Sequence, residues 1–381
     1  MTMISTTSSD SAANRFYRAQ SDMAPSEAAD DTALLVELTR GAVVESVHRG
    51  ALAVVDSQGT LLAAAGKPQH VAYLRSSAKP FQALPAVDAG ALDHYGLDNQ
   101  ALALMCASHH GTEEHVAVAQ RILDAIGLDC SALRCGVHWP VDESAGRRLA
   151  AAGLEPDTRH NNCSGKHAGM LTLARFWDLD DLDYTRPDHP VQAAILARLA
   201  AMTGLEPAAI HLAPDGCTVP AFALPLANAA LAFARLIDPA APPDCRRVVA
   251  AMQAHPHLVS GHGALDDTLM RAGAGVVVSK GGAEGYQGMG IRTPDGRSVG
   301  LALKIADGNA RAKGPVIVAV LEALGLVEAG VLAALEPLRR PAIMNHRRQV
   351  VGEMRAVIDA AALREAGGVV LRSQAVVEIA A

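Results

Sequence analysis

The feature that most constrains the fold is the order of two hydrophobic periodicities along the 381-residue chain. Residues 34–39, 44–55 and 60–65 have the character of strands, and the turn-forming residues 56–59 predict a hairpin between the last two. Strand character returns only near the other end, at residues 275–279, 288–292 and 298–305. The segment at 293–296 predicts a second hairpin there.

The middle of the chain is predominantly helical. Apolar residues recur at helical spacing in residues 112–126, and residues 191–203, 221–237 and 312–324 are predicted helices as well. Two polar stretches that contain glycine, 160–169 and 214–220, are predicted loops. Strands from both ends can join one antiparallel sheet, so we predict an α+β fold with helices packed against the sheet and a helical insertion at about 110–270. Residues 347–357 and 368–379 stay ambiguous.

Composition and charge narrow the function classes. The net charge is −7 and there is no basic tract, so we expect no nucleic-acid partner. No apolar run reaches the roughly 18 residues that a membrane span needs, so we expect no membrane partner either. Residues 1–31 are polar, which predicts a disordered leader before a single unit at 32–381. Because the leader lacks the apolar core of a secretory signal, we expect the protein in the cytoplasm. The six cysteines are too sparse to suggest disulfides.

A serine and a lysine at the start of a predicted helix form the first candidate for chemistry. Ser76 and Lys79 lie three residues apart, and Pro80 fits the first turn of a helix capped by the preceding serine. Residues three apart share a helix face, so the lysine amine can reach the serine hydroxyl. A lysine held neutral by burial or by a nearby cation can accept that proton. The alternative is a capping serine beside a surface lysine.

Two later segments strengthen this interpretation. Lys280 and Gly281 begin a Lys-Gly-Gly run directly after a predicted strand, and the glycines would let a substrate lie close to the backbone. In serine β-lactamases and penicillin-binding proteins, an S-x-x-K helix faces such a strand, with a serine-containing loop between them. Ser108, within Cys-Ala-Ser-His-His-Gly, is the candidate for that loop. Plain turns and a capping loop with incidental histidines are the alternatives.

The thiols form a weaker candidate. Cys163, His167 and Cys217 offer two sulfurs and an imidazole, which could hold Zn²⁺ only if their loops meet. Their spacing matches no standard zinc motif, so buried thiols without a metal are the alternative. The glycines around His262 suggest a tight turn near a ligand, whereas Asp266 and its neighbour fit a plain loop that enters a helix.

Taken together, six segments resemble the Rhizobium etli-type (thermolabile, type II) L-asparaginase family. They are residues 74–80, 106–111, 161–167, 215–217, 279–285 and 304–308. The resemblance extends from about residue 34 to the mid-300s and implies a catalytic unit that hydrolyses L-asparagine to L-aspartate and ammonia. It also implies a fold similar to serine β-lactamases and glutaminases, and a homodimer.

The resemblance further implies a role for each matching residue. The catalytic pairs are Ser76 with Lys79 and Ser108 with Lys280. The residues assigned to substrate binding are Arg75, His167, Asp215 and Gly281. The ligands of a zinc ion that shapes the pocket rather than activating water are Cys163, Lys166 and Cys217, with lysine in place of histidine as the third ligand. A glutaminase or another β-lactamase-like serine amidase would share both pairs, and a zinc- or amino-acid-binding protein without catalysis is the remaining alternative.

Overall fold

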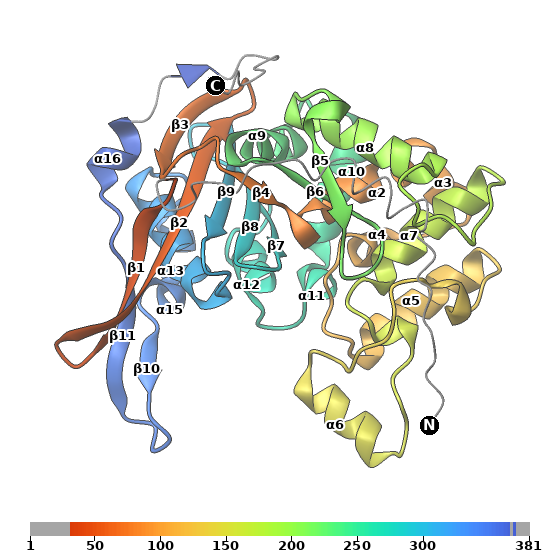
Figure 1. The fold of residues 1–381 in the computed structure, drawn as a ribbon, viewed down its shortest axis with the longest axis horizontal. Helices are drawn as coiled ribbons and strands as arrows, with labels where there is room; N and C mark the ends of the chain where they lie inside the picture. Colours follow the sequence, from red (N-terminus) through yellow and green to blue (C-terminus); the bar gives the residue numbers. More distant parts are fainter. Residues whose placement is uncertain (1–30, 366–368, 371–381) are drawn as a thin grey trace, which may run out of the picture.

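The computed structural model describes residues 31–365 and 369–370, which form a sheet-containing half and a helical half (Figure 1). The strands are β1 (Ala33–Arg40), β2 (Val43–Asp56), β3 (Thr60–Ala65), β4 (Val71–Tyr73), β5 (His211–Pro214), β6 (Pro220–Pro225), β7 (Val277–Gly282), β8 (Tyr286–Arg292), β9 (Ser298–Ile305), β10 (Ala342–Met344), β11 (Val350–Ala356) and β12 (Val369–Val370).

The helices are mostly in the middle of the chain. They are α2 (Lys79–Asp88), α3 (Ala91–His94), α4 (Asn99–Met105), α5 (Glu113–Ala125), α6 (Glu143–Ala151), α7 (Ser164–Phe176), α8 (Pro190–Thr203), α9 (Leu226–Ile237), α10 (Pro243–Ala254), α11 (Pro256–Val259), α12 (Leu265–Ala272), α13 (Lys313–Ala323), α14 (Ala329–Ala334), α15 (Glu336–Arg339) and α16 (Ala360–Glu365). Short 3-10 segments are η1 (Arg75–Ala78), η2 (Cys130–Ala132), η3 (Thr158–His160), η4 (Pro207–Ala209) and η5 (Ala310–Ala312).

Strands from both ends of the chain form one antiparallel sheet, as the sequence predicts. The order of its strands is β10-β11-β1-β2-β9-β8-β7. The long strand β2 organises it: its first half pairs with β1, its second half pairs with β3, and β9 lies along its other edge. β12 pairs with β3. The α+β class is therefore confirmed, and most of the elements between the two groups of strands are helices.

The sheet separates two hydrophobic cores because side chains alternate between its faces. On β2, Ala51 and Ala53 face the core that contains α9, whereas Leu52 and Val54 face the core that contains α13. Small residues let α9 lie close to this face: a Cβ on Gly300 would lie 1.8 Å from the Ala230 carbonyl oxygen. Glycine thus lets the helix backbone approach the sheet closely, which gives a three-layer arrangement in this half (Figure 1).

Several local predictions differ from the structure. Residues 221–237 are not one helix, because β6 occupies Pro220–Pro225 and α9 begins only after it. Together with β4 and β5, β6 forms a second, small sheet that the sequence pattern did not predict. The predicted loop at 160–169 becomes helical from Ser164. The N-cap of α2 is Ala78 without a side-chain cap, so the predicted serine cap is wrong.

Two predictions concern the ends of the chain. The ambiguous segment at 347–357 contains β11, whereas the segment at 368–379 lies outside the described residues apart from β12. The predicted leader, residues 1–31, also lies outside them except for Asp31. Among the helices in the described part of the chain, none is long and apolar enough to cross a membrane.

Candidate active site

Lys79, the first residue of α2, lies where three distant segments meet. Its side chain is buried, and Nζ donates hydrogen bonds to the carbonyl oxygen of Ala107 at 2.6 Å and to Ser108 Oγ at 3.0 Å. A third donation reaches the carbonyl oxygen of Asn162 at 3.3 Å. Three acceptors match the three donors of an ammonium group. The lysine of the S-x-x-K motif therefore contacts the serine of the second motif directly.

The two serines of the same motif differ in their surroundings. Ser77 is fully buried, and its hydroxyl donates to the carbonyl oxygen of Lys280 at 2.5 Å, which joins η1 to β7. Ser76 is only partly buried, and its hydroxyl has no hydrogen-bond partner among the described residues. A Cβ on Gly282 would lie 2.4 Å from the Leu74 carbonyl oxygen, so glycine allows the strand to lie against η1. Ser76 is thus the serine of this pair whose hydroxyl is free to react.

Lys280 lies on β7 with its amine buried beside α12. Nζ donates to the carbonyl oxygen of Gly281 at 2.8 Å and lies 3.6 Å from Asp266 Oδ2. Burial lowers the pKa of Lys280 to about 8; Asp266 opposes this change, while the charges of Lys79 and Lys313 add to it. Lys280 therefore exchanges its proton near neutral pH, unlike an ordinary lysine.

Asp266 belongs to the same network as Lys280, which the sequence pattern did not indicate. Its buried carboxylate accepts hydrogen bonds from Ser279 Oγ at 2.8 Å, from the Gly281 backbone N–H at 2.8 Å and from Gln287 Nε2 at 2.7 Å. Burial alone would raise the pKa of Asp266, but Lys280, Lys313 and these hydrogen bonds outweigh burial and lower it. The interpretation as a plain loop residue is wrong for Asp266, which is an ionised partner of Lys280.

Gly281 lies within this network. A Cβ at this position would lie 3.1 Å from Gln287 Oε1 and 3.1 Å from Lys313 Nζ, so there is little room for a side chain. Its backbone N–H donates to Asp266 Oδ2 at 2.8 Å. This contact is with the protein itself, and the predicted role in substrate binding stays a prediction.

The structure brings Cys163, Lys166 and Cys217 together. Cys163 is the N-cap of α7, Lys166 lies in the first turn of that helix, and Cys217 lies in the loop between β5 and β6. All three are buried, and Lys166 Nζ lies 2.8 Å from Cys217 Sγ. The two loops therefore meet, which is the condition that a site built from both thiols requires, and the zinc ion itself stays a prediction.

Electrostatics in the cluster favour one thiolate and one ammonium. A hydrogen bond from Cys217, followed by the charges of Lys79 and Lys166, holds the pKa of Cys163 well below its usual range despite burial. Burial opposes the charge on Lys166, but Cys217, Cys163 and Asp215 raise its pKa. Cys163 in turn raises the pKa of Cys217, so the titration of the two thiols belongs to the pair.

Arg75 and Asp215 form an ion pair at the edge of the same region. Arg75 Nε lies 2.9 Å from Asp215 Oδ1, and the side chains are 30% and 12% exposed. Burial would raise the pKa of Asp215, but Lys166 and Arg75 lower it, so the carboxylate is ionised. Arg75 has φ of 50°, an uncommon conformation for a residue with a Cβ. A strained backbone directly before Ser76 is typical of functional sites.

His167 lies behind the sulfur cluster. Its side chain is fully buried, and Nδ1 lies 2.6 Å from the hydroxyl oxygen of Tyr184, which accepts the backbone N–H of Arg134. Burial, with the charges of Lys166 and Lys79, lowers the pKa of His167 well below its usual value. A neutral, buried imidazole supports the neighbouring loop here, and its predicted contact with substrate stays a prediction.

A family model described as L-asparaginase II matches residues 36–356 of the chain. No curated protein is a significant match. Crystal structures of a protein named Mglu show slight similarity: the native form has 14% identity and a TM-score of 0.36, over 76% of this chain and 63% of Mglu. The glutamate form has 17% identity and a TM-score of 0.32, over 73% and 61%. The chain thus spans less than two thirds of the length of Mglu.

Proposed function

Because a family model covers residues 36–356, this chain belongs to the L-asparaginase II family, and we propose that it hydrolyses the side-chain amide of L-asparagine to L-aspartate and ammonia. The family makes it an amidohydrolase of the asparaginase and glutaminase type. The proposed chemistry is serine–lysine catalysis through an acyl-enzyme.

One observation carries the proposed chemistry. The buried Lys79 amine, one helical turn from Ser76, is hydrogen-bonded to Ser108, and a second buried lysine with a lowered pKa lies close enough to influence it electrostatically. A free hydroxyl, two proton-carrying amines and a connecting hydroxyl are the groups that acyl transfer to serine requires. At pH 7.5, a pKa of about 8 leaves roughly a quarter of Lys280 neutral and able to accept a proton.

In the acylation step, Ser76 Oγ attacks the amide carbon of the substrate side chain. The hydroxyl proton passes to the Lys79 amine once Lys79 has given its own proton through Ser108 toward Lys280. The protonated lysine then donates to the departing nitrogen, so the C–N bond breaks and ammonia leaves. The product is an ester between Ser76 and the β-carboxyl of aspartate.

In the second step, water attacks the ester carbonyl and transfers a proton to the same lysine, which returns it to Ser76 as the C–O bond breaks. Backbone N–H groups beside Ser76 and at the end of β7 are the proposed donors to the oxyanion in both steps. One such donor contributes about 2.7–4 kcal/mol to transition-state stabilisation. Aspartate is released and Ser76 is restored.

Arg75 and Asp215 are proposed to orient the substrate. An amino-acid substrate presents a carboxylate and an ammonium at one carbon, and the pair offers a guanidinium and an ionised carboxylate side by side. Arg75 would bind the α-carboxylate and Asp215 the α-ammonium. The ion pair between them would hold both groups in position before the substrate binds.

We propose a zinc ion as the partner of Cys163, Lys166 and Cys217. Two thiols and an amine 2.8 Å from one of them form, once zinc has displaced their protons, a donor set that suits this borderline-soft ion. Bound zinc would supply a fixed link between α7 and the loop that carries Asp215. Since Ser76 supplies the nucleophile, the proposed role is to shape the pocket.

The proposed homodimer rests on two hairpins, β1–β2 and β10–β11, that extend away from the rest of the molecule (Figure 1). Both expose large apolar side chains, among them Val43 at 69% and Val350 at 67%. Exposed apolar clusters on an arm favour association with a second copy. Light scattering that gives the mass of a single chain at micromolar concentration would contradict it.

Replacement of single serines tests the nucleophile. We expect Ser76→Ala to abolish both ammonia release and the acyl-enzyme found by mass spectrometry after rapid quenching. Ser77→Ala is the matched control: it loses a buried hydrogen bond and about 1 kcal/mol of stability, but it should still form the acyl-enzyme. A nearly normal rate in Ser76→Ala, with an inactive Ser108→Ala, would identify Ser108 as the nucleophile instead.

Substrate and metal are tested in the same assay. Ammonia release is compared for asparagine and glutamine, and turnover of the β-lactam nitrocefin is measured, each with and without a chelator. Asparagine turnover that survives chelation supports serine chemistry, whereas faster glutamine or nitrocefin turnover favours the alternative amidases. Calorimetric binding of asparagine without ammonia release would indicate a non-catalytic binding protein.

A further inference from the structure

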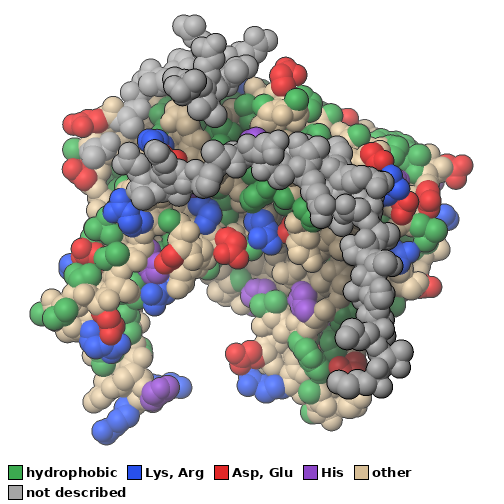
Figure 2. Space-filling view, in the orientation of Figure 1, with side chains coloured by type: hydrophobic (Ala, Val, Ile, Leu, Met, Phe, Trp, Pro, Cys, Tyr) green, Lys and Arg blue, Asp and Glu red, His purple; other side chains and the backbone are tan. Residues whose placement is uncertain are grey.

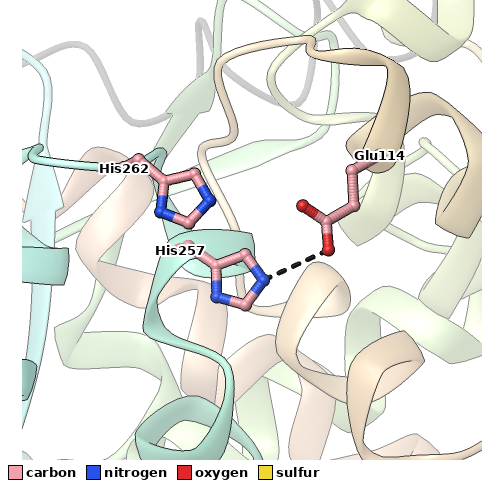
Figure 3. A group of neighbouring side chains, drawn as sticks. All are labelled: Glu114, His257 and His262. Atoms are coloured by element: carbon pink, nitrogen blue, oxygen red, sulfur yellow. Dashed lines mark hydrogen bonds and ion pairs between the residues drawn. The ribbon is translucent and has the colours of Figure 1, made fainter.

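Three side chains outside the described network converge at the start of α5 and around α11. Glu114 lies in the first turn of α5, His257 lies in α11, and His262 lies in the loop that follows α11. Their ligand atoms all lie within 4.8 Å of one another. Figure 3 shows the two imidazole rings one above the other, with the Glu114 carboxylate facing them.

The contacts within this cluster hold the three side chains in place, but they leave most of the ligand atoms without a hydrogen bond inside the cluster. His257 Nε2 lies 3.2 Å from Glu114 Oε1, and the rings of His257 and His262 are stacked with centroids 4.8 Å apart and planes 7° apart. The backbone of His257 is fixed, because its carbonyl oxygen lies 3.1 Å from Nε2 of the buried His115. The ion pair between His257 and Glu114 is partly exposed and contributes little stability, and it does not account for the position of the third side chain.

Two imidazoles and one carboxylate are a ligand set for a divalent transition-metal ion. Such sites bind Zn²⁺ with metal–nitrogen distances of about 2.0–2.1 Å and leave the remaining positions to water. Ligand atoms around one ion lie about 3.4 Å apart in tetrahedral geometry. The present maximum of 4.8 Å therefore has to shrink by about 1.4 Å. Glu114 and His262 are exposed and can rotate that far, while the less exposed His257 stays in place.

The cluster lies beside the candidate active site. The backbone N–H of Ser108 donates to the carbonyl oxygen of Val259, the last residue of α11, at 2.9 Å. A Cβ on Gly261 would lie 2.4 Å from His110 Nδ1, so this loop lies directly against the segment that carries Ser108. Histidines are visible in the hollow between the two halves, where Figure 1 shows α11 (Figure 2).

We propose that Glu114, His257 and His262 bind one divalent transition-metal ion of the Zn²⁺ class, separate from the sulfur cluster at Cys163. A bound ion links α5 to the loop after α11 and thereby restrains the segment that carries Ser108. Solvent reaches the site through the exposed Glu114 and His262, so the site loads and unloads with the free concentration of the ion.

The test uses Ni²⁺ as the probe and the full chain without an affinity tag. Isothermal titration is compared among the unaltered chain, Glu114→Gln and His262→Asn. Both substitutions change exposed side chains. His346→Asn is the matched control, because it removes an exposed histidine from the hairpin between β10 and β11. The expected result is that one Ni²⁺ equivalent binds at least about tenfold more weakly in both cluster variants and is unchanged in the control.

A second measurement separates this site from the sulfur cluster. Co²⁺ bound by the thiolates of the sulfur cluster gives a sulfur-to-metal charge-transfer absorbance. This absorbance should be the same in Glu114→Gln and His262→Asn as in the unaltered chain. Equal Ni²⁺ stoichiometry and affinity in the unaltered chain and both cluster variants would overturn the proposal. So would an equal loss in His346→Asn. Binding is measured whether or not the chain releases ammonia, so this result is independent of the proposed asparaginase activity.

Discussion

Lys280 and Lys166 are both almost completely buried, yet their charges are controlled in opposite directions. Only 1% of the surface of Lys280 and 3% of that of Lys166 is exposed to solvent. Burial and neighbouring lysines lower the pKa of Lys280 to about 8, whereas Cys217, Cys163 and Asp215 raise the pKa of Lys166. The same desolvation cost therefore has two outcomes.

The two pKa values shift in opposite directions because the negative charge beside Lys166 is shared with fewer other groups than the negative charge beside Lys280. Lys166 lies 2.8 Å from a sulfur of a pair that carries a thiolate. Lys280 lies 3.6 Å from Asp266, whose carboxylate also accepts hydrogen bonds from Ser279, Gln287 and a backbone N–H and lies near Lys313. Asp266 is thus shared among several positive and polar groups. Lys280 is suited to proton exchange, and Lys166 to a fixed position beside sulfur.

The largest effect is expected when Lys280, the amine proposed to exchange a proton, is removed. Lys280→Met keeps most of the buried volume and should lower kcat for ammonia release by about 10²–10⁴-fold, which is the usual contribution of a positioned acid or base. The fold should survive, because Lys313 remains near Asp266. Steady-state kinetics and thermal melting would be measured together.

Lys304→Met is the control for this variant. Lys304 is also a partly buried strand lysine, but its Nζ donates to the carbonyl oxygens of Glu284 and Ile305 rather than to the site. Its kcat should stay within a few-fold of the unaltered chain. If Lys280→Met kept a comparable rate, Lys280 would have no role in proton transfer.

A smaller effect is expected when the other lysine is removed. Lys166→Met deletes one of three proposed zinc ligands and should weaken Zn²⁺ binding by at least about 10–100-fold, which is the usual cost of losing only an outer-shell partner of a ligand. The measurement is competition with a chromophoric chelator, at a fixed pH because ligand protonation affects affinity. The kcat should fall less than in Lys280→Met, and a larger fall would reverse the roles assigned to the two lysines.

The sequence singled out candidate groups for catalysis, but it did not indicate their partners in space. Ser76, Lys79, Ser108 and Lys280 stand out because short motifs carry specific residue types at specific spacing. The motif alone could not show that the Lys79 amine meets Ser108, because its position depends on carbonyl oxygens 28 and 83 residues away. Tertiary contacts of this kind leave no periodic signal in the chain.

Two failures have local causes. Residues 221–237 contain apolar side chains at every spacing, so the pattern cannot distinguish the buried strand β6 from the helix α9 that follows it. Asp266 was missed because it lies beside Asp267 at the start of α12, where acidic residues are typical of any helix. Only the packing of α12 against β7 turns Asp266 toward Lys280.

Asp266 gives the finest test of the comparison. Lys280 must be neutral to accept a proton, so activity should rise with pH through a midpoint near its pKa of about 8. Asp266 raises the pKa of Lys280, and removing that charge should lower it further. Asp266→Asn should therefore move the rising limb of kcat/KM to lower pH, by about one unit. A purely structural loss would lower the whole profile without moving it.

Asp267→Asn provides the matched control one residue away. Asp267 is also buried, but its carboxylate accepts the backbone N–H of Gly263 and pairs with Arg271. Its variant should lose stability while the midpoint stays at the unaltered value. If the midpoint in Asp266→Asn did not move, Lys280 would not be the titrating group. A move to higher pH would mean that the charge of Asp266 acts on the profile through some other group.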